Sequence, residues 1–194
     1  MKEVAFLFSI CFSITRHVMA YPETRIDDDK NYEQYQHINK ALQNNDSFSW
    51  MFNRTYLPNP DDPEYACVYA NVTKLPGTGN YIFMQGWTTQ TNTTVEVPLS
   101  VKTQKTEGNG YVRTEDNAMH VTLKFPNGTV KSFGLYKLIF SDYESCDILR
   151  VMSRYPACEL YLHSHFLKEG VPKKCMSIYK NACGKQDYYH YPCV

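Results

Sequence analysis

The sequence lacks the features that are typical of membrane-spanning proteins, of nucleic-acid-binding proteins and of the common enzyme classes. After residue 20 no stretch approaches the roughly eighteen consecutive apolar residues of a membrane-spanning helix. Its 20 Lys and Arg balance its 20 Asp and Glu, which argues against a nucleic-acid partner or a general membrane-surface role. It contains no nucleophile signature, no glycine-rich phosphate loop and no zincin motif. We therefore expect a non-enzyme without metal or cofactor, whose function depends on a local binding site.

The first twenty residues have the pattern of a secretory signal peptide. Lys2 precedes an apolar run over residues 4–14, and Ala20 stands at a suitable cleavage position. The run is too short to span a bilayer. We predict a signal peptide at 1–20, one mature domain at 21–194 and secretion into an extracellular fluid.

Cysteines and glycosylation sequons agree with secretion. Of seven cysteines, Cys11 is lost with the signal, and six remain: Cys67, Cys146, Cys158, Cys175, Cys183 and Cys193. An even number in an oxidising compartment predicts disulfides, although six cysteines allow fifteen connectivities. Five Asn-x-Ser/Thr sequons predict a glycoprotein, at Asn45, Asn53, Asn71, Asn92 and Asn127.

The remaining sequence predicts strands between two helices. Apolar residues recur at three- and four-residue steps over residues 27–43, which predicts a short amphipathic helix, and a second helix is expected over 173–182, with Pro172 at its start. Segments rich in β-branched and aromatic residues, separated by Pro, Gly and Asn, predict eight strands: 48–52, 66–70, 81–84, 93–101, 119–125, 130–140, 146–152 and 158–163. Eight antiparallel strands can close into a barrel that holds one small ligand, and a two-sheet sandwich is the alternative.

The most informative motif places two carboxylates on apolar strands beside cysteines. Cys146-Asp147-Ile148 is followed after ten residues by Glu159-Leu160-Tyr161, and after thirteen more by Cys175. A carboxylate in such surroundings is costly unless it meets a cation. The pattern resembles the amine-binding signature of the tick salivary lipocalins, the histamine- and serotonin-binding family. This resemblance favours an all-β, eight-stranded lipocalin barrel with flanking helices.

The resemblance also implies disulfide pairs and ligand residues. It pairs Cys67 with Cys193, Cys146 with Cys175, and Cys158 with Cys183. It makes Asp147, Glu159 and Tyr161 ligand residues, and it extends more loosely to three others: Tyr56 in the first loop, Glu96 on the fourth strand and Asp46 before the first strand. By implication the protein sequesters histamine or serotonin and suppresses host inflammation at a feeding site.

The sequence departs from the family in two places. The first loop has no counterpart of the family's Trp, and the sixth strand offers Phe133, Tyr136 and Lys137 where histamine binders carry a Phe and an acid. An inward Lys137 would neutralise an acid and weaken cation binding. One of the family's two amine sites would then be lost, and the site of Asp147 and Glu159 would remain.

Other interpretations stay open at this point. The barrel of this family also houses fatty acids, leukotrienes or sterols, and 16 Tyr with 10 Phe can line an apolar pocket. Alternatively, the outer surface binds a host protein as an immunomodulator. His163 and His165 have the spacing of a metal-binding pair but lack a third ligand nearby. Trp50 and Trp87 are expected in the core or against a ligand, with core packing favoured for Trp50.

Overall fold

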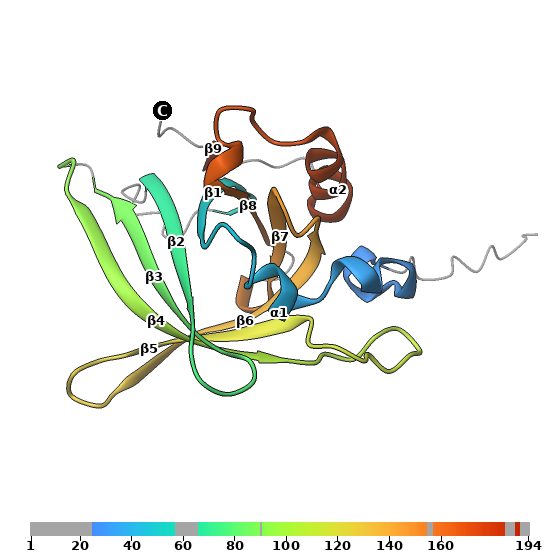
Figure 1. The fold of residues 1–194 in the computed structure, drawn as a ribbon, viewed down its shortest axis with the longest axis horizontal. Coiled ribbons are helices and arrows are strands. Elements are labelled where there is room, and N and C mark those ends of the chain that lie inside the picture. Colours follow the sequence, from blue (N-terminus) through green and yellow to red (C-terminus); the bar gives the residue numbers. More distant parts are fainter. Residues whose placement is uncertain (1–24, 57–65, 90, 155–156, 185–188, 191–194) are drawn as a thin grey trace, which may run out of the picture.

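Eight antiparallel strands form the closed barrel that the sequence predicts (Figure 1). The computed structural model describes residues 25–56, 66–89, 91–154, 157–184 and 189–190. The predicted signal peptide therefore lies outside the described residues. All eight predicted strands are present, with shifted ends: β1 Phe48–Arg54, β2 Ala66–Lys74, β3 Asn80–Thr88, β4 Thr94–Gln104, β5 Ala118–Lys124, β6 Val130–Ser141, β7 Cys146–Val151 and β8 Cys158–His163.

The barrel closes through β1. Every other strand pairs with its neighbours in chain order, whereas β1 pairs with β8 on one side and with β2 on the other. The pairing with β2 covers only residues 48–50 of β1. Beside Asn53 and Arg54 a two-residue strand, β9 (Tyr189–His190), pairs with β1 instead.

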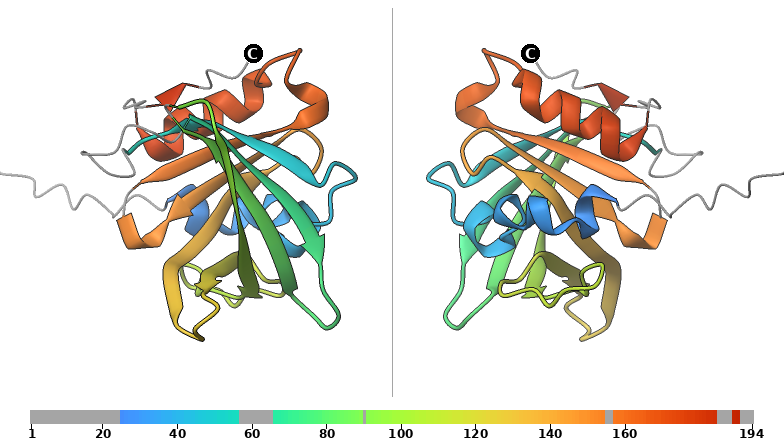
Figure 2. Two further views of the ribbon diagram at one scale, coloured as in Figure 1. Left: turned by 90° about the vertical axis from the view of Figure 1, so that its left-hand side faces the viewer. Right: turned by 90° about the vertical axis from the view of Figure 1, so that its right-hand side faces the viewer.

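The C-terminal helix and three barrel strands form a second core outside the barrel. Helix α2 (Lys173–Cys183) packs on β6 and β7 and covers their outer faces (Figure 2). Its buried residues Ile178 and Tyr179 contact outward side chains such as Ile148 and Leu160. Pro172 is the residue before the helix rather than its first residue. Because their outer faces pack on α2 and their inner faces line the barrel, β7 and β8 are buried on both sides.

Two of the implied disulfides tie this outer core together. Cys146 bonds to Cys175, and Cys158 bonds to Cys183, so both bridges join α2 to the barrel. The implied bridge between Cys67 and Cys193 lies partly outside the described residues, because Cys193 is not among them.

The predicted N-terminal helix is short and interrupted. It consists of two 3-10 segments, Ile26–Asp28 and Lys30–Tyr35, and one turn of α-helix, α1 (Ile38–Ala41). Asp29 is extended and caps the second segment, since its side chain accepts a hydrogen bond from the Asn31 backbone. The Gln36 side chain donates to the carbonyls of Ile26 and Ile139. The bond to Ile139 of β6 and the bond to Ile26 of the first segment replace the continuous helical ladder that the periodicity predicts.

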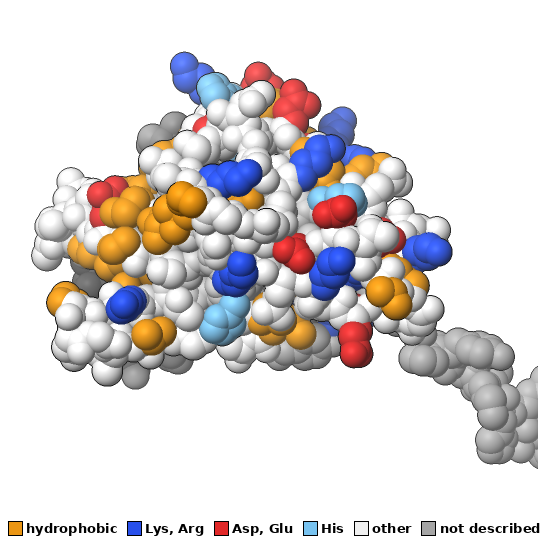
Figure 3. Space-filling model, turned by 60° about the horizontal axis from the view of Figure 1, so that its bottom comes forward, with side chains coloured by type: hydrophobic (Ala, Val, Ile, Leu, Met, Phe, Trp, Pro, Cys, Tyr) orange, Lys and Arg blue, Asp and Glu red, His pale blue; other side chains and the backbone are white. Residues whose placement is uncertain are grey.

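Charges of both signs are interspersed on one face of the molecule (Figure 3). Figure 3 shows Lys, Arg, Asp and Glu side chains alternating over one face, with apolar side chains between them. In the described part of the chain, no helix is long and apolar enough to cross a membrane.

Candidate functional site

The barrel encloses a cavity of about 800 Å³. One wall is apolar because alternate residues of β2 to β5 point inward, among them Val68, Ala70, Phe83, Leu99, Met119 and Val121. Residues Ile38, Ala41 and Leu42 of the α1 region also line the cavity. This volume is in the upper part of the range of about 300–1,000 Å³ that is usual for small-molecule pockets.

The opposite wall carries polar side chains. Alternation along β7 points Asp147, Leu149 and Val151 inward, and along β8 it points Glu159 and Tyr161 inward. Asp147 pairs in register with Tyr161, and Leu149 pairs with Glu159. The two acids are therefore one inward position apart, about 7 Å along the strands. The structure thus brings together the two carboxylates of the sequence motif.

Glu159 lies in a hydrogen-bonded network of tyrosines. Its carboxylate accepts a bond from Tyr161 at 3.1 Å and another from Tyr56. Burial raises the pKa of Glu159, although these two bonds and the charges of Arg54 and Arg154 act in the opposite direction. Glu159 is only 2% exposed, and each of its two carboxylate oxygens already accepts a hydrogen bond.

Asp147 is bonded at only one of its oxygens. Its Oδ2 lies 3.0 Å from His163 Nε2. Its Oδ1 is buried and has no hydrogen-bond partner among the described residues. Burial of an acceptor without a donor is costly. Oδ1 is consequently the position in this wall where a ligand N–H would gain most.

Asp46 lines the cavity but directs its carboxylate to the protein. Oδ1 accepts the Phe48 backbone N–H, and Oδ2 accepts the backbone N–H of His165 and lies 2.8 Å from its ring nitrogen. Its backbone carbonyl lies 3.0 Å from His163 Nδ1. Asp46 therefore positions His163 and His165, and its carboxylate is directed to protein groups and not to a ligand.

Two residues point away from the positions expected of them. Glu96 is exposed on β4, because its neighbour Val97 points inward, and it accepts a hydrogen bond from Tyr69 on the outer face. Lys137 also lies outside the cavity, where it pairs with Asp28. Lys137 therefore does not neutralise an acid of the cavity, and Tyr136 lines the cavity in its place on β6.

The sequence analysis did not place four cationic or titratable residues in the cavity: Arg54, Lys131, Arg154 and His163. The signal for His163 was available, because it continues the inward series of Glu159 and Tyr161 by two residues. Arg54 had no such signal. A bulge between Met51 and Asn53 shifts the alternation of β1 and turns Arg54 inward.

Trp50, Trp87 and His165 lie in different surroundings. Trp87 lines the cavity, whereas Trp50 is half-buried on the outer face, where it contacts Phe48 and donates to Ser164. The side chain of His165 is 77% exposed. His163 and His165 thus do not share one face as the strand spacing suggested.

One predicted glycosylation site is enclosed by the fold. Asn53 is 4% exposed within β1, where a glycan has no room. The sequons at Asn45, Asn92 and Asn127 are exposed and that at Asn71 is half-buried, so they stay predictions.

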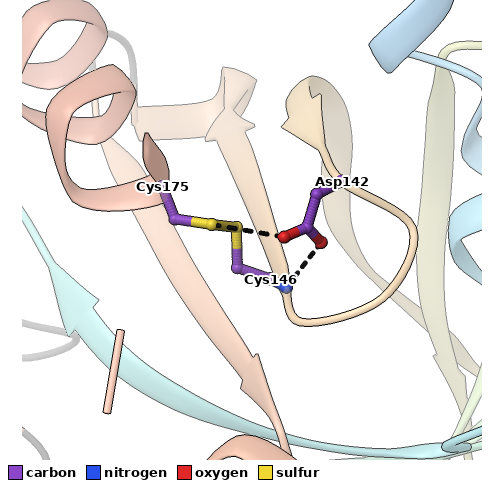
Figure 4. Close-up of side chains that lie close together, drawn as sticks. All are labelled: Asp142, Cys146 and Cys175. Carbon is purple, nitrogen blue, oxygen red and sulfur yellow. Dashed lines mark hydrogen bonds between the residues drawn. A yellow bond between two sulfur atoms is a disulfide. The ribbon is translucent and has the colours of Figure 1, made fainter. Parts of the chain in front are cut away.

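A cluster of possible metal ligands occurs beside the first disulfide. Asp142, Cys146 and Cys175 lie close together, but the two sulfurs are bonded to each other (Figure 4). Asp142 instead accepts the backbone N–H groups of Ser145 and Cys146. Burial raises the pKa of Asp142, yet these bonds and that of the Ser145 hydroxyl outweigh it and lower the pKa. The cluster is a capped turn before β7.

Comparison with known proteins agrees with the barrel and with the family resemblance. A family model described as tick histamine binding protein matches residues 26–193. No curated protein sequence matches the chain.

Solved structures with a similar fold have low sequence identity. The crystal structure of AM182 with serotonin has a TM-score of 0.54 at 17% identity and covers 80% of this chain and 89% of AM182. Japanin from Rhipicephalus appendiculatus, bound to cholesterol, has a TM-score of 0.47 at 14% identity and covers 72% and 88%. Lobster apocrustacyanin A1 has a TM-score of 0.43 at 12% identity and covers 74% and 72%. The first of these likenesses supports the lipocalin-like fold.

Proposed function

The chain belongs to the tick histamine-binding protein family, and from this premise we propose that it sequesters a small biogenic amine, histamine or serotonin, in its barrel. The capture is stoichiometric and involves no turnover. With the predicted signal peptide, the protein is secreted in saliva and removes inflammatory mediators from a host.

The unpartnered oxygen of Asp147 carries this proposal. A protonated amine loses its water on entering the cavity, so it needs acceptors there. Asp147 Oδ1 is a buried acceptor that lacks a donor among the described residues, and an ammonium N–H supplies one. Glu159 adds a second carboxyl group on the same wall, and Tyr56, Tyr136 and Tyr161 add aromatic surface.

A lipid is the second candidate ligand. The observation that favours it is the continuous apolar wall of β2 to β5 in a cavity of about 800 Å³. An apolar ligand would gain from burial against this wall without any contact with the acids. The two candidates therefore differ in their dependence on Asp147 and Glu159.

Calorimetric titration with histamine and serotonin tests the proposal. In the Asp147→Asn/Glu159→Gln variant, which keeps the side-chain shapes, we expect amine affinity to fall at least about thirtyfold, or about 2 kcal/mol. Glu96→Gln is the matched control, because Glu96 also accepts a tyrosine hydroxyl but lies on the outer face. It should leave the affinity unchanged.

Two results would contradict the proposal. Amine binding that survives the double change would remove the acids from the site. Absence of amine binding by the folded protein would favour the lipid, which mass spectrometry of the native protein would then detect, or else a host protein bound at the outer surface.

A further inference from the structure

Both ring nitrogens of His163 face hydrogen-bond acceptors. Nδ1 lies 3.0 Å from the backbone carbonyl oxygen of Asp46, and Nε2 lies 3.0 Å from Oδ2 of Asp147. A carbonyl oxygen only accepts, so Nδ1 carries a hydrogen. A neutral imidazole then has no hydrogen left for Nε2, and a lone pair there would face the carboxylate.

The bond between His163 and Asp147 therefore contains one proton more than a neutral imidazole and an ionised carboxylate would bring. Either His163 is an imidazolium beside an ionised Asp147, or Asp147 is protonated and donates to a neutral imidazole. The proton count and the net charge of zero are the same in both descriptions. In the empty cavity, Asp147 is consequently not a free anion.

The groups around this pair support its retention of the proton. Burial lowers the pKa of His163, but the bond to Asp147 and the Asp46 carbonyl outweigh burial and raise the pKa above its ordinary value of 6.5. The Asp46 carboxylate is occupied by His165. Near Asp147 in the turn before β7, burial and the Asp147 charge raise the pKa of Tyr143 to about 12, so it stays neutral.

More distant charges also bear on the pair. Lys40 of α1 lies over the Tyr143 ring, with its Nζ 4.1 Å from the ring centroid. Tyr161, the register partner of Asp147, has a pKa raised by burial and stays neutral. Glu159 lies one inward position away and is held by its tyrosines.

We propose that the ligand's ammonium group replaces this proton, donating to both Asp147 and Nε2 of His163. The inference rests on the proposed amine binding and adds His163 as a residue that determines specificity. One N–H of the ammonium donates to the carboxylate, and a second donates to the lone pair that Nε2 gains. One proton leaves to solvent for each ammonium that binds, so charge and atoms balance.

This exchange selects ligands by the hydrogens on their nitrogen. A primary ammonium has three N–H donors and satisfies both acceptors. A trimethylated ammonium carries the same charge but no N–H, so it cannot take over the role of the proton. We expect serotonin to bind at least tenfold more tightly than its N-trimethyl derivative.

The exchange also links affinity to pH. Below the pKa of the pair, each unit of rising pH should strengthen serotonin binding up to tenfold, with release of up to one proton per site. Glu159 contributes in the same direction, because its own pKa is raised. The contribution of His163 to this pH dependence is therefore the part that disappears in the His163→Gln variant.

Calorimetry in buffers of different ionisation enthalpy, between about pH 5.5 and pH 8.5, counts the protons released when serotonin binds. The wild type and His165→Gln should both show the release; His165 is the matched control, since it too contacts Asp46 but is exposed. His163→Gln keeps a donor for Asp147 and should release about one proton fewer near pH 6.

Nitrogen-15 NMR of the histidine rings tests the same point without a variant. Both nitrogens of His163 should be protonated or share a proton in the empty protein, and Nε2 should lose its hydrogen when serotonin is added. Serotonin binding with an unchanged His163 ring and no proton release would overturn this inference and leave the proposed function intact. No binding of any amine would overturn both.

Discussion

Tyr161 donates its phenolic hydroxyl to Glu159, the residue two positions before it on the same strand, at a distance of 3.1 Å. Side chains two apart on a strand share a face, so the bond forms inside the barrel. Tyr56 donates to the other carboxylate oxygen from the end of the first strand. The buried charge of Glu159 is thus held by two phenols from different parts of the chain.

Tyr161→Phe should destabilise the empty protein by about 1–3 kcal/mol near pH 8, because it removes a donor from a buried carboxylate. Burial raises the pKa of Glu159, and the Tyr161 bond acts against that rise. The loss should therefore shrink as the pH falls towards 4.5, where a protonated Glu159 no longer needs the donor. Urea denaturation at both pH values measures it; an equal loss at both would show that only packing was changed.

The bond between His163 and Asp147 should make stability depend on pH. The pKa of His163 is higher in the folded protein than its ordinary value of 6.5. Its stabilisation is therefore fully present below pH 6.5 and is lost as the pH rises through the folded pKa. Thermal unfolding of the empty protein should show this decline, and His163→Gln should flatten it. A decline that persists unchanged in the variant would assign it to another group.

Arg150 connects the N-terminal segment to the outer core. It is 1% exposed, lies 3.1 Å from Asp27 Oδ1 and donates to the Ala182 carbonyl of α2. Arg150→Met should cost about 3–5 kcal/mol, because Asp27 keeps a buried charge without its main partner. Chemical denaturation should show that Asp27→Asn/Arg150→Met recovers much of this loss. A double variant as unstable as the single one would locate the effect in packing.

The ion pair of Asp27 and Arg150 should account for part of the stability that the fold loses at acid pH. Burial raises the pKa of Asp27, but Arg150, with smaller contributions from Arg25 and Lys137, outweighs burial and the pKa is lowered below 3.8. Its stabilisation is present above pH 3.8 and is lost as the pH falls through the folded pKa. Acid titration followed by circular dichroism should find a weaker acid transition in Asp27→Asn than in the exposed-residue control Glu107→Gln.

Gly86 allows the Tyr69 ring to cross β3 on the outer face. A Cβ at residue 86 would lie 2.1 Å from the Tyr69 ring. Gly86→Ala should therefore cost about 1–3 kcal/mol through overpacking and displace Tyr69 from Glu96. In the Tyr69→Ala background the same change should cost almost nothing when measured by denaturation. An undiminished cost would mean that the strand itself requires glycine.

The fold was predictable because its signals are local. Alternation and turn residues located all eight strands, and the spacing of Cys146, Asp147, Glu159 and Cys175 placed both acids on neighbouring strands. The N-terminal helix was less predictable. Its periodicity is helical, but Gln36 bonds to a strand about a hundred residues away, and that long-range contact breaks the helix.

The site was only partly predictable, because each inward or outward direction depends on register. Glu96 was expected in the site but points outward, since the neighbouring valine fills the inward position. Arg54 points inward because of a bulge that no residue pattern announces. The hydrogen bond between Asp147 and His163 joins residues of two strands and exists only once these strands are paired.

The short seam between β1 and β2 has a consequence for exchange with solvent. Three residue pairs close the barrel there, whereas nine join β3 to β4. Local opening follows the boundary with fewest bonds. The Val72 amide bonds across this seam to the Ser47 carbonyl, and alternation points the Ala70 amide to the same side, so these two amides should exchange with deuterium before those of β7 and β8. An opening at this seam would uncover the cavity while the outer core, with its two bridges to α2, stays folded.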